Sequence, residues 1–129
     1  MLSKISEFFR VIGELKYIIP LLRYKFPDPD DNESLAHTFE RTVSKFGLRN
    51  FIYFEEETWT YSEVNQQANI LAKKLLDDGV SHGDRVILFM ENRPDFVISI
   101  IALNKIGAIG VLINTSLTGK PLILSLIHI

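Results

Sequence analysis

The sequence contains no cysteine among its 129 residues. Disulfide frameworks and thiolate metal sites are therefore excluded. An excess of positive charge is also missing, since 14 basic and 16 acidic residues give a net charge of −2, which offers no reason to expect nucleic acid as a partner. The hydrophobic share of 47% and the charged share of 23% are typical of one globular domain or part of one.

Familiar catalytic patterns are absent as well. The sequence has no Gly-x-Ser-x-Gly elbow and no Gly-x-Gly-x-x-Gly motif. The histidines His37, His82 and His128 are far apart and lack metal-ligand spacing. The acidic connector Phe26–Asp31 is not followed by the glycine and glutamate that a calcium loop needs. We therefore predict no catalytic, cofactor-binding or metal-binding residue in this chain.

Long uncharged runs are scarce. The most apolar stretch, Phe96–Ile113, still contains Lys105 and Gly107, and a central lysine costs about 2.5–3.5 kcal/mol on membrane insertion. This stretch predicts a buried helix followed by a buried strand rather than a membrane span.

Residues 1–27 are predicted to form an amphipathic helix and its connector. Residues 1–25 contain five basic and two acidic side chains, so this segment is basic while the remainder is acidic. Lys4 and Lys16 lie near the edges of an apolar stripe, where their long stems can snorkel. The stripe, spaced by three and four residues, comprises Ile5, Phe8, Ile12, Leu15, Ile19 and Leu22.

Two interpretations of this leader stay open. It lacks the uninterrupted apolar core and cleavage site of a signal peptide, and it is too charged to span a bilayer. In one interpretation the stripe and its two lysines lie in a membrane interface and contact anionic lipid. In the other, the helix packs on its own protein.

The body of the chain is predicted to be α/β. A helix is expected over residues 32–46 with a left-handed stop at Gly47, followed by two strands joined by the acidic turn Glu55–Glu57. Thr60 and Glu63 form a capping box that opens the next helix, which ends at Gly79.

A βαβ unit follows that helix. Arg85–Met90 and Ala108–Asn114 read as strands buried on both faces, because their apolar residues do not alternate with polar ones. A helix from Pro94 to a stop at Gly107 separates them. The two strands should therefore be parallel.

This order of elements resembles a known family. The segments "WTYSEVNQQAN", "GVSHGDRV", "ENRPDFV" and "LNKIGAIGVLINTSL" resemble the early part of adenylate-forming acyl-CoA synthetases. Within that family they are most similar to the long-chain and very-long-chain fatty acyl-CoA synthetases, the group that includes fatty-acid transport proteins. The resemblance covers residues 34–122. It makes residues 28–123 the incomplete first part of an AMP-binding domain.

The resemblance implies an activity for the parent protein. Such enzymes use ATP and Mg²⁺ to convert a fatty acid to an acyl-adenylate, and coenzyme A then displaces AMP. Their phosphate loop, magnesium-binding glutamate and catalytic lysine lie further along a longer chain. The fragment itself is therefore expected to be inactive and to bind no cofactor. The parent is expected in the cytoplasm, peripherally on the inner face of a membrane.

One stretch imitates a phosphate loop. The family's loop reads Thr-Ser-Gly-Thr-Thr-Gly-x-Pro-Lys, whereas residues 115–122 read "TSLTGKPL". Leu117 stands where the first glycine lets the backbone approach phosphate, and Leu122 replaces the lysine. We therefore expect a turn leading into the next helix, not a phosphate site.

The last six residues, "LSLIHI", match a possible translation of a sequencing-library adapter. We interpret residues 124–129 as non-native read-through; the alternative is the start of a genuine apolar helix. The expected function of the parent is a fatty acid–CoA ligase. The alternatives are a ligase for a shorter or polar, carnitine-like acid, and a non-catalytic module that binds a membrane or partner.

Overall fold

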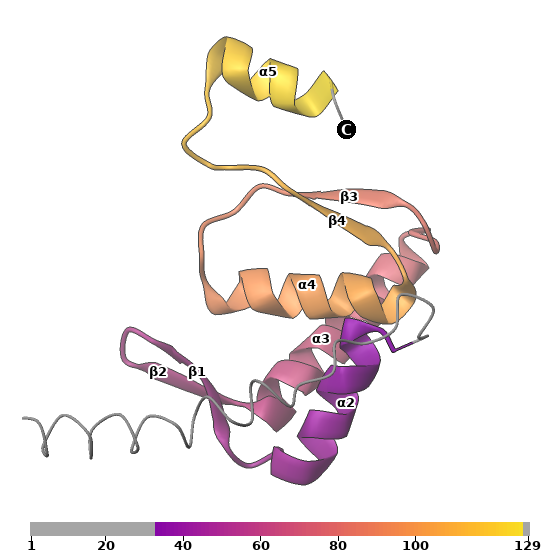
Figure 1. The fold of residues 1–129 in the computed structure, drawn as a ribbon, viewed down its shortest axis with the longest axis vertical. Helices are drawn as coiled ribbons and strands as arrows, with labels where there is room; N and C mark the ends of the chain where they lie inside the picture. The colour runs from indigo at the N-terminus through magenta and orange to yellow at the C-terminus, as the bar shows by residue number, and fades with distance from the viewer. Residues whose placement is uncertain (1–32, 128–129) are drawn as a thin grey trace, which may run out of the picture. The chain divides into compact units, whose positions relative to one another are not determined.

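The computed structural model describes residues 33–127, which form an α/β unit (Figure 1). The leader, residues 1–27, lies outside the described residues, and so does His128. In chain order the elements are α2 (Leu35–Phe46), β1 (Asn50–Phe54), β2 (Glu57–Thr60), α3 (Tyr61–Asp77), β3 (Arg85–Leu88), α4 (Pro94–Ile106), β4 (Ile109–Leu112) and α5 (Gly119–Ile127).

The predicted helix α2 is present, but the prediction for its end is wrong. Gly47 has a φ of −50°, which is right-handed backbone. A glycine fits here because a Cβ would collide with the hydroxyl of Ser62 and the carbonyl of Val43. The amide of Ser62 also donates to the Gly47 carbonyl at 3.0 Å. The end of α2 therefore lies directly against the first turn of α3.

Strands β1 and β2 form the predicted antiparallel hairpin. Glu55 and Glu56 make the turn, and Glu55 adopts a positive φ of 51°. Glu57 belongs to β2 instead, and its carboxylate accepts a hydrogen bond of 3.1 Å from the indole N–H of Trp59. All three glutamates are exposed, as expected of a solvated hairpin end.

The predicted capping box at the start of α3 is confirmed. The Thr60 hydroxyl accepts from the Glu63 amide at 3.2 Å, and the Glu63 carboxylate accepts from the Thr60 amide at 2.8 Å. These reciprocal bonds satisfy two donors that a helix start leaves free. At the other end, Gly79 has a φ of 92°, so this glycine supplies the left-handed backbone that ends the helix.

The βαβ unit is confirmed too. β3 pairs in parallel with β4, from Arg85 opposite Ile109 to Leu88 opposite Leu112. Helix α4 connects them, and Gly107 ends this helix with a φ of 70°. The apolar stretch 96–113 is thus a helix followed by a strand. Across residues 33–127, no helix is both long and apolar enough to cross a membrane.

The prediction that β3 and β4 are buried on both faces is wrong for the described residues. Leu88 is buried and packs with Leu103 of α4, but Ile87 and Ile109 remain 47% and 49% exposed. Side chains alternate between the faces of a strand, so α4 covers only the face that carries Leu88. A strand whose residues are all apolar can be buried on both faces. The sequence does not show, however, whether another element covers the face opposite α4.

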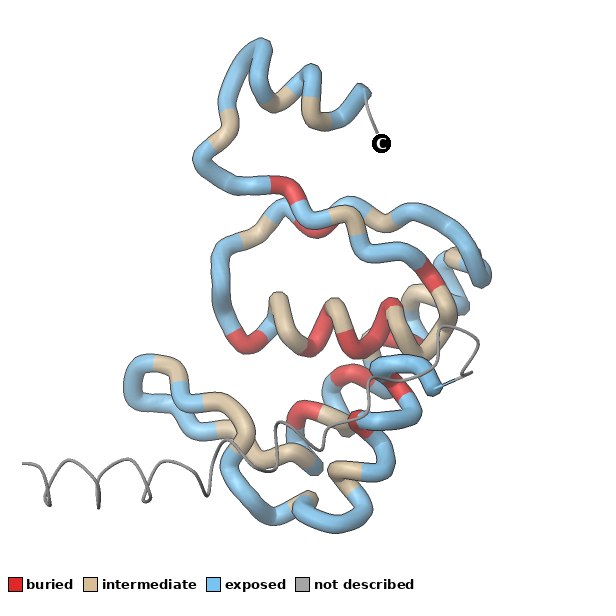
Figure 2. Tube along the Cα trace, in the orientation of Figure 1, coloured by how far each residue is buried: buried red, intermediate tan, exposed pale blue. Residues whose placement is uncertain are grey.

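Helix α4 takes part in both hydrophobic clusters (Figure 2). Ile98, Ile101 and Ala102 pack with residues of α2 and α3, whereas Leu103 packs against β3 and Ala108. Ile106 contacts both clusters. The core is therefore organised around this helix.

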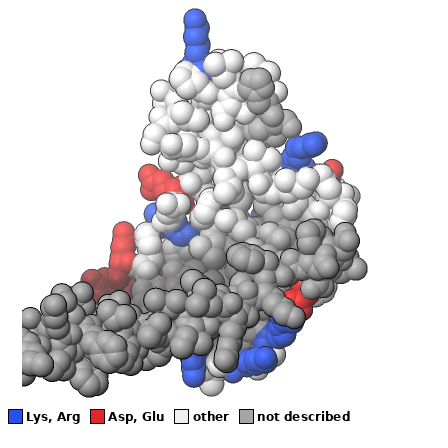
Figure 3. All heavy atoms as spheres, in the orientation of Figure 1, with Lys and Arg blue, Asp and Glu red and all other residues white. Residues whose placement is uncertain are grey.

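Helix α5 begins at Gly119 and buries none of its residues. Ile123 and Leu124 are each more than half exposed. Figure 3 shows that the face over α5 and the β3–β4 sheet is mostly uncharged. The interpretation of residues 124–129 as read-through stays a prediction.

Candidate functional site

A hollow lies where the parallel strands β3 and β4 both end. Ligands of α/β proteins commonly bind outside the carboxyl ends of parallel strands. This hollow has a volume of about 390 Å³. It is lined by Met90, Glu91, Asn92, Phe96, Ile113, Asn114 and Thr115.

A turn after β4 forms one side of this hollow. The side-chain oxygen of Asn114 accepts a hydrogen bond from the Ser116 amide at 2.9 Å. The carbonyl of Asn114 accepts another from the Leu117 amide at 3.1 Å. Residues 114–118 thus lead into α5 as a turn, which is the structure expected for this stretch.

The charge of the hollow does not suit a nucleotide. Glu91 is the charged residue in its lining, which includes no lysine or arginine. A carboxylate without a nearby cation repels phosphate. The lining of this hollow therefore offers a phosphate group no cation; that the chain binds no nucleotide stays a prediction.

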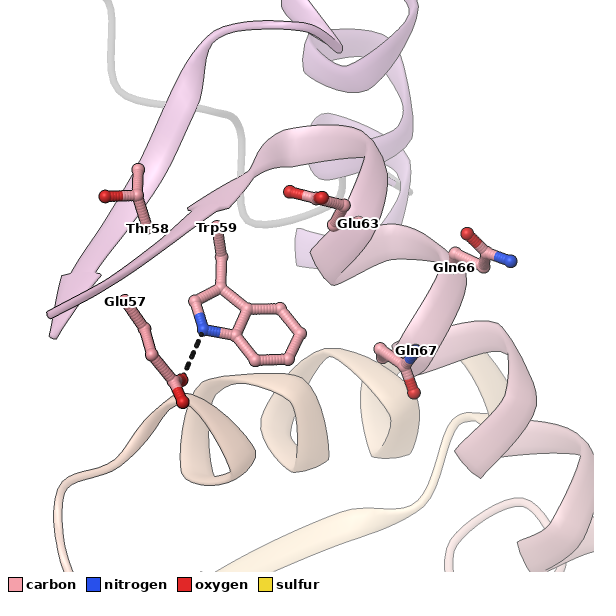
Figure 4. Close-up of a pocket in the computed structure, with 6 residues that line it drawn as sticks. All are labelled: Glu57, Thr58, Trp59, Glu63, Gln66 and Gln67. Atoms are coloured by element: carbon pink, nitrogen blue, oxygen red, sulfur yellow. Dashed lines mark hydrogen bonds between the residues drawn. The ribbon is translucent and has the colours of Figure 1, made fainter.

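A second hollow, also of about 390 Å³, lies between β2 and α3 (Figure 4). The indole of Trp59 lies at its centre, and Gln66 and Gln67 extend from α3. Both carboxylates in its lining are already engaged: Glu57 by the indole N–H and Glu63 by Thr60. The backbone and then the side-chain hydrogen bond from Thr60 lower the pKa of Glu63. These hydrogen bonds stabilise the hairpin and cap the start of α3, and we assign neither carboxylate a role in acid–base chemistry.

The structure brings together two histidines that are distant in the sequence. His37 and His82 line one hollow of about 530 Å³, together with Glu40 and Lys105. Lys105 forms an ion pair with Glu40, which joins α4 to α2. Among residues 33–127, no cluster of His, Asp and Glu could hold a metal ion. No local sequence pattern predicts that His37 and His82 line the same hollow, because helix packing builds this hollow from segments that are distant in the sequence.

The predicted membrane-interface residues, from Lys4 to Leu22, all lie outside the described residues. Their role stays a prediction.

Comparison with known proteins supplies the family. A family model described as "AMP-binding enzyme" matches residues 39–126. Novobiocin biosynthesis protein H of Streptomyces niveus is 40% identical over 81 residues, which are 63% of this chain and 14% of that protein. A medium/long-chain-fatty-acid–CoA ligase of Mycobacterium tuberculosis is 33% identical over 98 residues, which are 76% of this chain and 16% of that protein.

A solved structure agrees. The N-terminal subdomain of Klebsiella oxytoca NpsA, in complex with 3-hydroxybenzoyl-AMSN, superposes with a TM-score of 0.71 at 28% identity, over 73% of this chain and 24% of that one. The chain thus spans less than a fifth of each of the two relatives. The resemblance to adenylate-forming enzymes is confirmed at the level of the family. This chain belongs to the AMP-binding enzyme family, and its described residues form part of an N-terminal adenylation subdomain.

Proposed function

We propose that the chain is part of an ATP-dependent fatty acid–CoA ligase, which converts a fatty acid to an acyl-adenylate and then to an acyl-CoA. One observation carries the proposal: the likeness to the mycobacterial medium/long-chain-fatty-acid–CoA ligase extends over three quarters of this chain. The Asn92–Phe96 segment and the Asn114–Thr115 turn, which favour this subfamily, lie together at the carboxyl edge of the β3–β4 sheet.

The described residues have a structural role in this proposal. Family membership implies that the full enzymes use ATP, and we propose Mg²⁺ and coenzyme A as further requirements of the parent protein. No catalytic step is proposed for residues 33–127; that they carry no catalytic residue stays a prediction. Instead, the β3–α4–β4 unit fixes where the chain leaves the sheet after Asn114, toward the segments that would carry the phosphate loop.

An aryl acid is the second candidate substrate. The NpsA structure that resembles this chain holds a 3-hydroxybenzoyl group, which is the observation in its favour. Shorter or polar acids, including carnitine-like ones, are further alternatives that the described hollows do not separate.

We further propose a location for the parent. The basic, apolar stripe of residues 2–25 suits peripheral attachment to the anionic inner face of a membrane, where a fatty-acid substrate partitions. The cytoplasm would then supply ATP and coenzyme A.

The test begins with the gene. The reading frame after residue 123 is determined from source DNA, and the complete protein is purified. Acyl-CoA and AMP formation are measured with ATP, Mg²⁺ and coenzyme A for dodecanoate, palmitate, 3-hydroxybenzoate and carnitine. We expect turnover of the fatty acids, with kcat/KM at least about tenfold above that for the other acids, which is about 1.4 kcal/mol in transition-state binding.

Other outcomes would contradict the proposal. Turnover restricted to 3-hydroxybenzoate would make the parent an aryl-acid enzyme. A genuine stop codon after residue 129 would favour the non-catalytic module. Omission of coenzyme A is the control: if the adenylate stays bound, pyrophosphate release should then stop after about one equivalent per enzyme and AMP should not be released.

A further inference from the structure

The hollow between β2 and α3 is built around the single tryptophan of the sequence. Part of the Trp59 indole packs against the hydrophobic cluster that contains Phe39, Val64 and Ala68, so the ring is held in place from that side. The rest of the ring lines the hollow, whose volume is about 390 Å³. Ligand pockets span about 300–1,000 Å³, so this hollow suits a small ligand.

Trp59 is paired with a carboxylate at the edge of its ring. The indole N–H donates to Glu57 Oε2 at 3.1 Å (Figure 4). Hydrogen bonds polarise the groups that make them, so a carboxylate on the N–H makes the face of the indole richer in electrons. Tryptophan is already the aromatic side chain that binds cations best. The ring face of Trp59 and the charge of Glu57 therefore both attract a cation.

The remaining lining of the hollow is also compatible with a cation. It consists of the carboxylate of Glu63 and the neutral polar side chains of Thr58, Gln66 and Gln67. Among the described residues that line the hollow, none is a lysine, arginine or histidine. Both carboxylates already accept hydrogen bonds within the chain. This lining therefore favours a cation that is held by charge and ring contact rather than by many hydrogen bonds.

A quaternary ammonium group is such a cation, because it has no N–H and its charge is spread over its methyl groups. We propose that this hollow binds a small quaternary ammonium alcohol of the choline type. Its methyl groups would lie on the Trp59 ring beside Glu57, since aromatic rings recognise quaternary ammonium ligands in this way. Its hydroxyl would lie toward the amides of Gln66 and Gln67.

This site goes beyond the proposed ligase function, because it needs no nucleotide, no coenzyme A and no catalytic group. It also differs from a site for a carnitine-like acid. The carboxylate of such a ligand would be repelled by Glu57 and Glu63. The choline site can therefore fail while the ligase assay succeeds, and the reverse also holds.

The test follows the fluorescence of Trp59 in the full chain, fused to a carrier protein that contains no tryptophan. Choline chloride is titrated at constant ionic strength, and 3,3-dimethyl-1-butanol is the matched ligand of similar shape without the charge. We expect a saturable change in emission with choline. Binding of the neutral alcohol should be at least about fivefold weaker, which corresponds to about 1 kcal/mol. Carnitine should also bind more weakly than choline.

Two matched variants make the result specific. Glu57→Gln keeps an acceptor for the indole N–H but removes the charge, so it should weaken choline binding about threefold to fivefold and leave the neutral alcohol unchanged. Glu56→Gln removes the same charge from the hairpin turn, outside the hollow, and should not change choline binding. Circular dichroism checks that both variants keep the fold.

Three results would each overturn the proposal. The first is an equal affinity for choline and the neutral alcohol, because the charge would then play no part. The second is an equal effect of Glu57→Gln and Glu56→Gln on choline binding. The third is the absence of a saturable change in Trp59 emission with choline.

Discussion

The imidazole ring of His82 lies against the α-carbon of Gly107, so closely that a Cβ at position 107 would collide with ring atom Cδ2 and crowd Nε2. The backbone reinforces this contact, because the Gly83 amide donates to the Gly107 carbonyl at 2.9 Å. The turn before β3 and the turn after α4 are therefore fitted to one another. His82 is exposed but also packs on this glycine.

The first prediction concerns Gly107→Ala. The left-handed backbone alone should cost about 1–2 kcal/mol of unfolding free energy, and displacement of His82 should add to it. Gly79→Ala is the matched control, because Gly79 also has a positive φ but a Cβ there would meet no atom within 4 Å. Chemical denaturation should show Gly107→Ala to be the more destabilising, with His82→Ala removing the difference. Equal costs for the two alanines would refute the steric contribution of His82.

The second prediction concerns the capping box. Thr60→Ala removes the acceptor for the Glu63 amide and should lower the unfolding free energy by about 1 kcal/mol. Thr60→Ser keeps the hydroxyl and should remain close to wild type. Amide hydrogen exchange should increase mainly in the first turn of α3. Uniformly faster exchange across the chain would instead indicate a global defect.

The third prediction is a pH dependence from Glu63. Hydrogen bonds from Thr60 lower the pKa of this carboxyl in the folded chain, so folding favours its charged form. Its stabilising contribution should be complete above the pKa of the unfolded carboxyl and should be lost as pH falls through the lower, folded pKa. Thermal unfolding across acidic pH should be less pH-dependent in Glu63→Gln. The Glu33 carboxyl, whose pKa is lowered by its hydrogen bond to Arg41, changes stability in the same direction, so the comparison should be repeated with Glu33→Gln as background.

The fourth prediction concerns the exposed face of the β3–β4 sheet. The chain should self-associate, because Ile87 and Ile109 present apolar surface beside unpaired strand edges. Ile87→Thr with Ile109→Thr should shift light-scattering mass toward the monomer while keeping the thermal midpoint nearly constant. Leu88→Ala, on the covered face, should instead cost about 2–5 kcal/mol. Unchanged self-association in the double variant would exclude this face as its cause.

The fifth prediction concerns residues 1–25. Deleting them from the full-length protein should abolish flotation with anionic liposomes, because the apolar stripe and the lysines would be lost together. Replacing only Phe8 and Ile12 by serine should weaken flotation while leaving the charge intact. Wild-type flotation after the deletion would support the alternative, in which the helix packs on its own protein.

Local chemistry explains which parts of the fold could be predicted. The capping box at Thr60 and the helix stop at Gly107 depend on residues within a few positions of one another, and both are confirmed. Gly47 was assigned the wrong role because its reason is contact with Ser62, in another helix. The exposure of Ile109 was not predicted either. The sequence shows that this strand is apolar but not which elements cover its faces.

The candidate sites were harder to predict than the fold. The family resemblance predicted a turn after Asn114 that leads into the next helix, and the structure has this turn; the absence of a phosphate site in residues 115–120 stays a prediction. The cation–π contact between Arg93 and Phe54 was not predicted, because the two residues are distant in the sequence and meet only when the hairpin packs beside α4. The sequence shows only an arginine just before a helix.

The double membership of Ile106 has a consequence for how the described residues unfold. This side chain packs in both hydrophobic clusters. Unfolding of the β1–β2 hairpin with its cluster therefore removes contacts from the β3–α4–β4 unit, and the reverse also holds. The two halves should therefore melt in one cooperative transition. Probes in β1 and β4 would then report the same midpoint, and Ile106→Ala would lower both together.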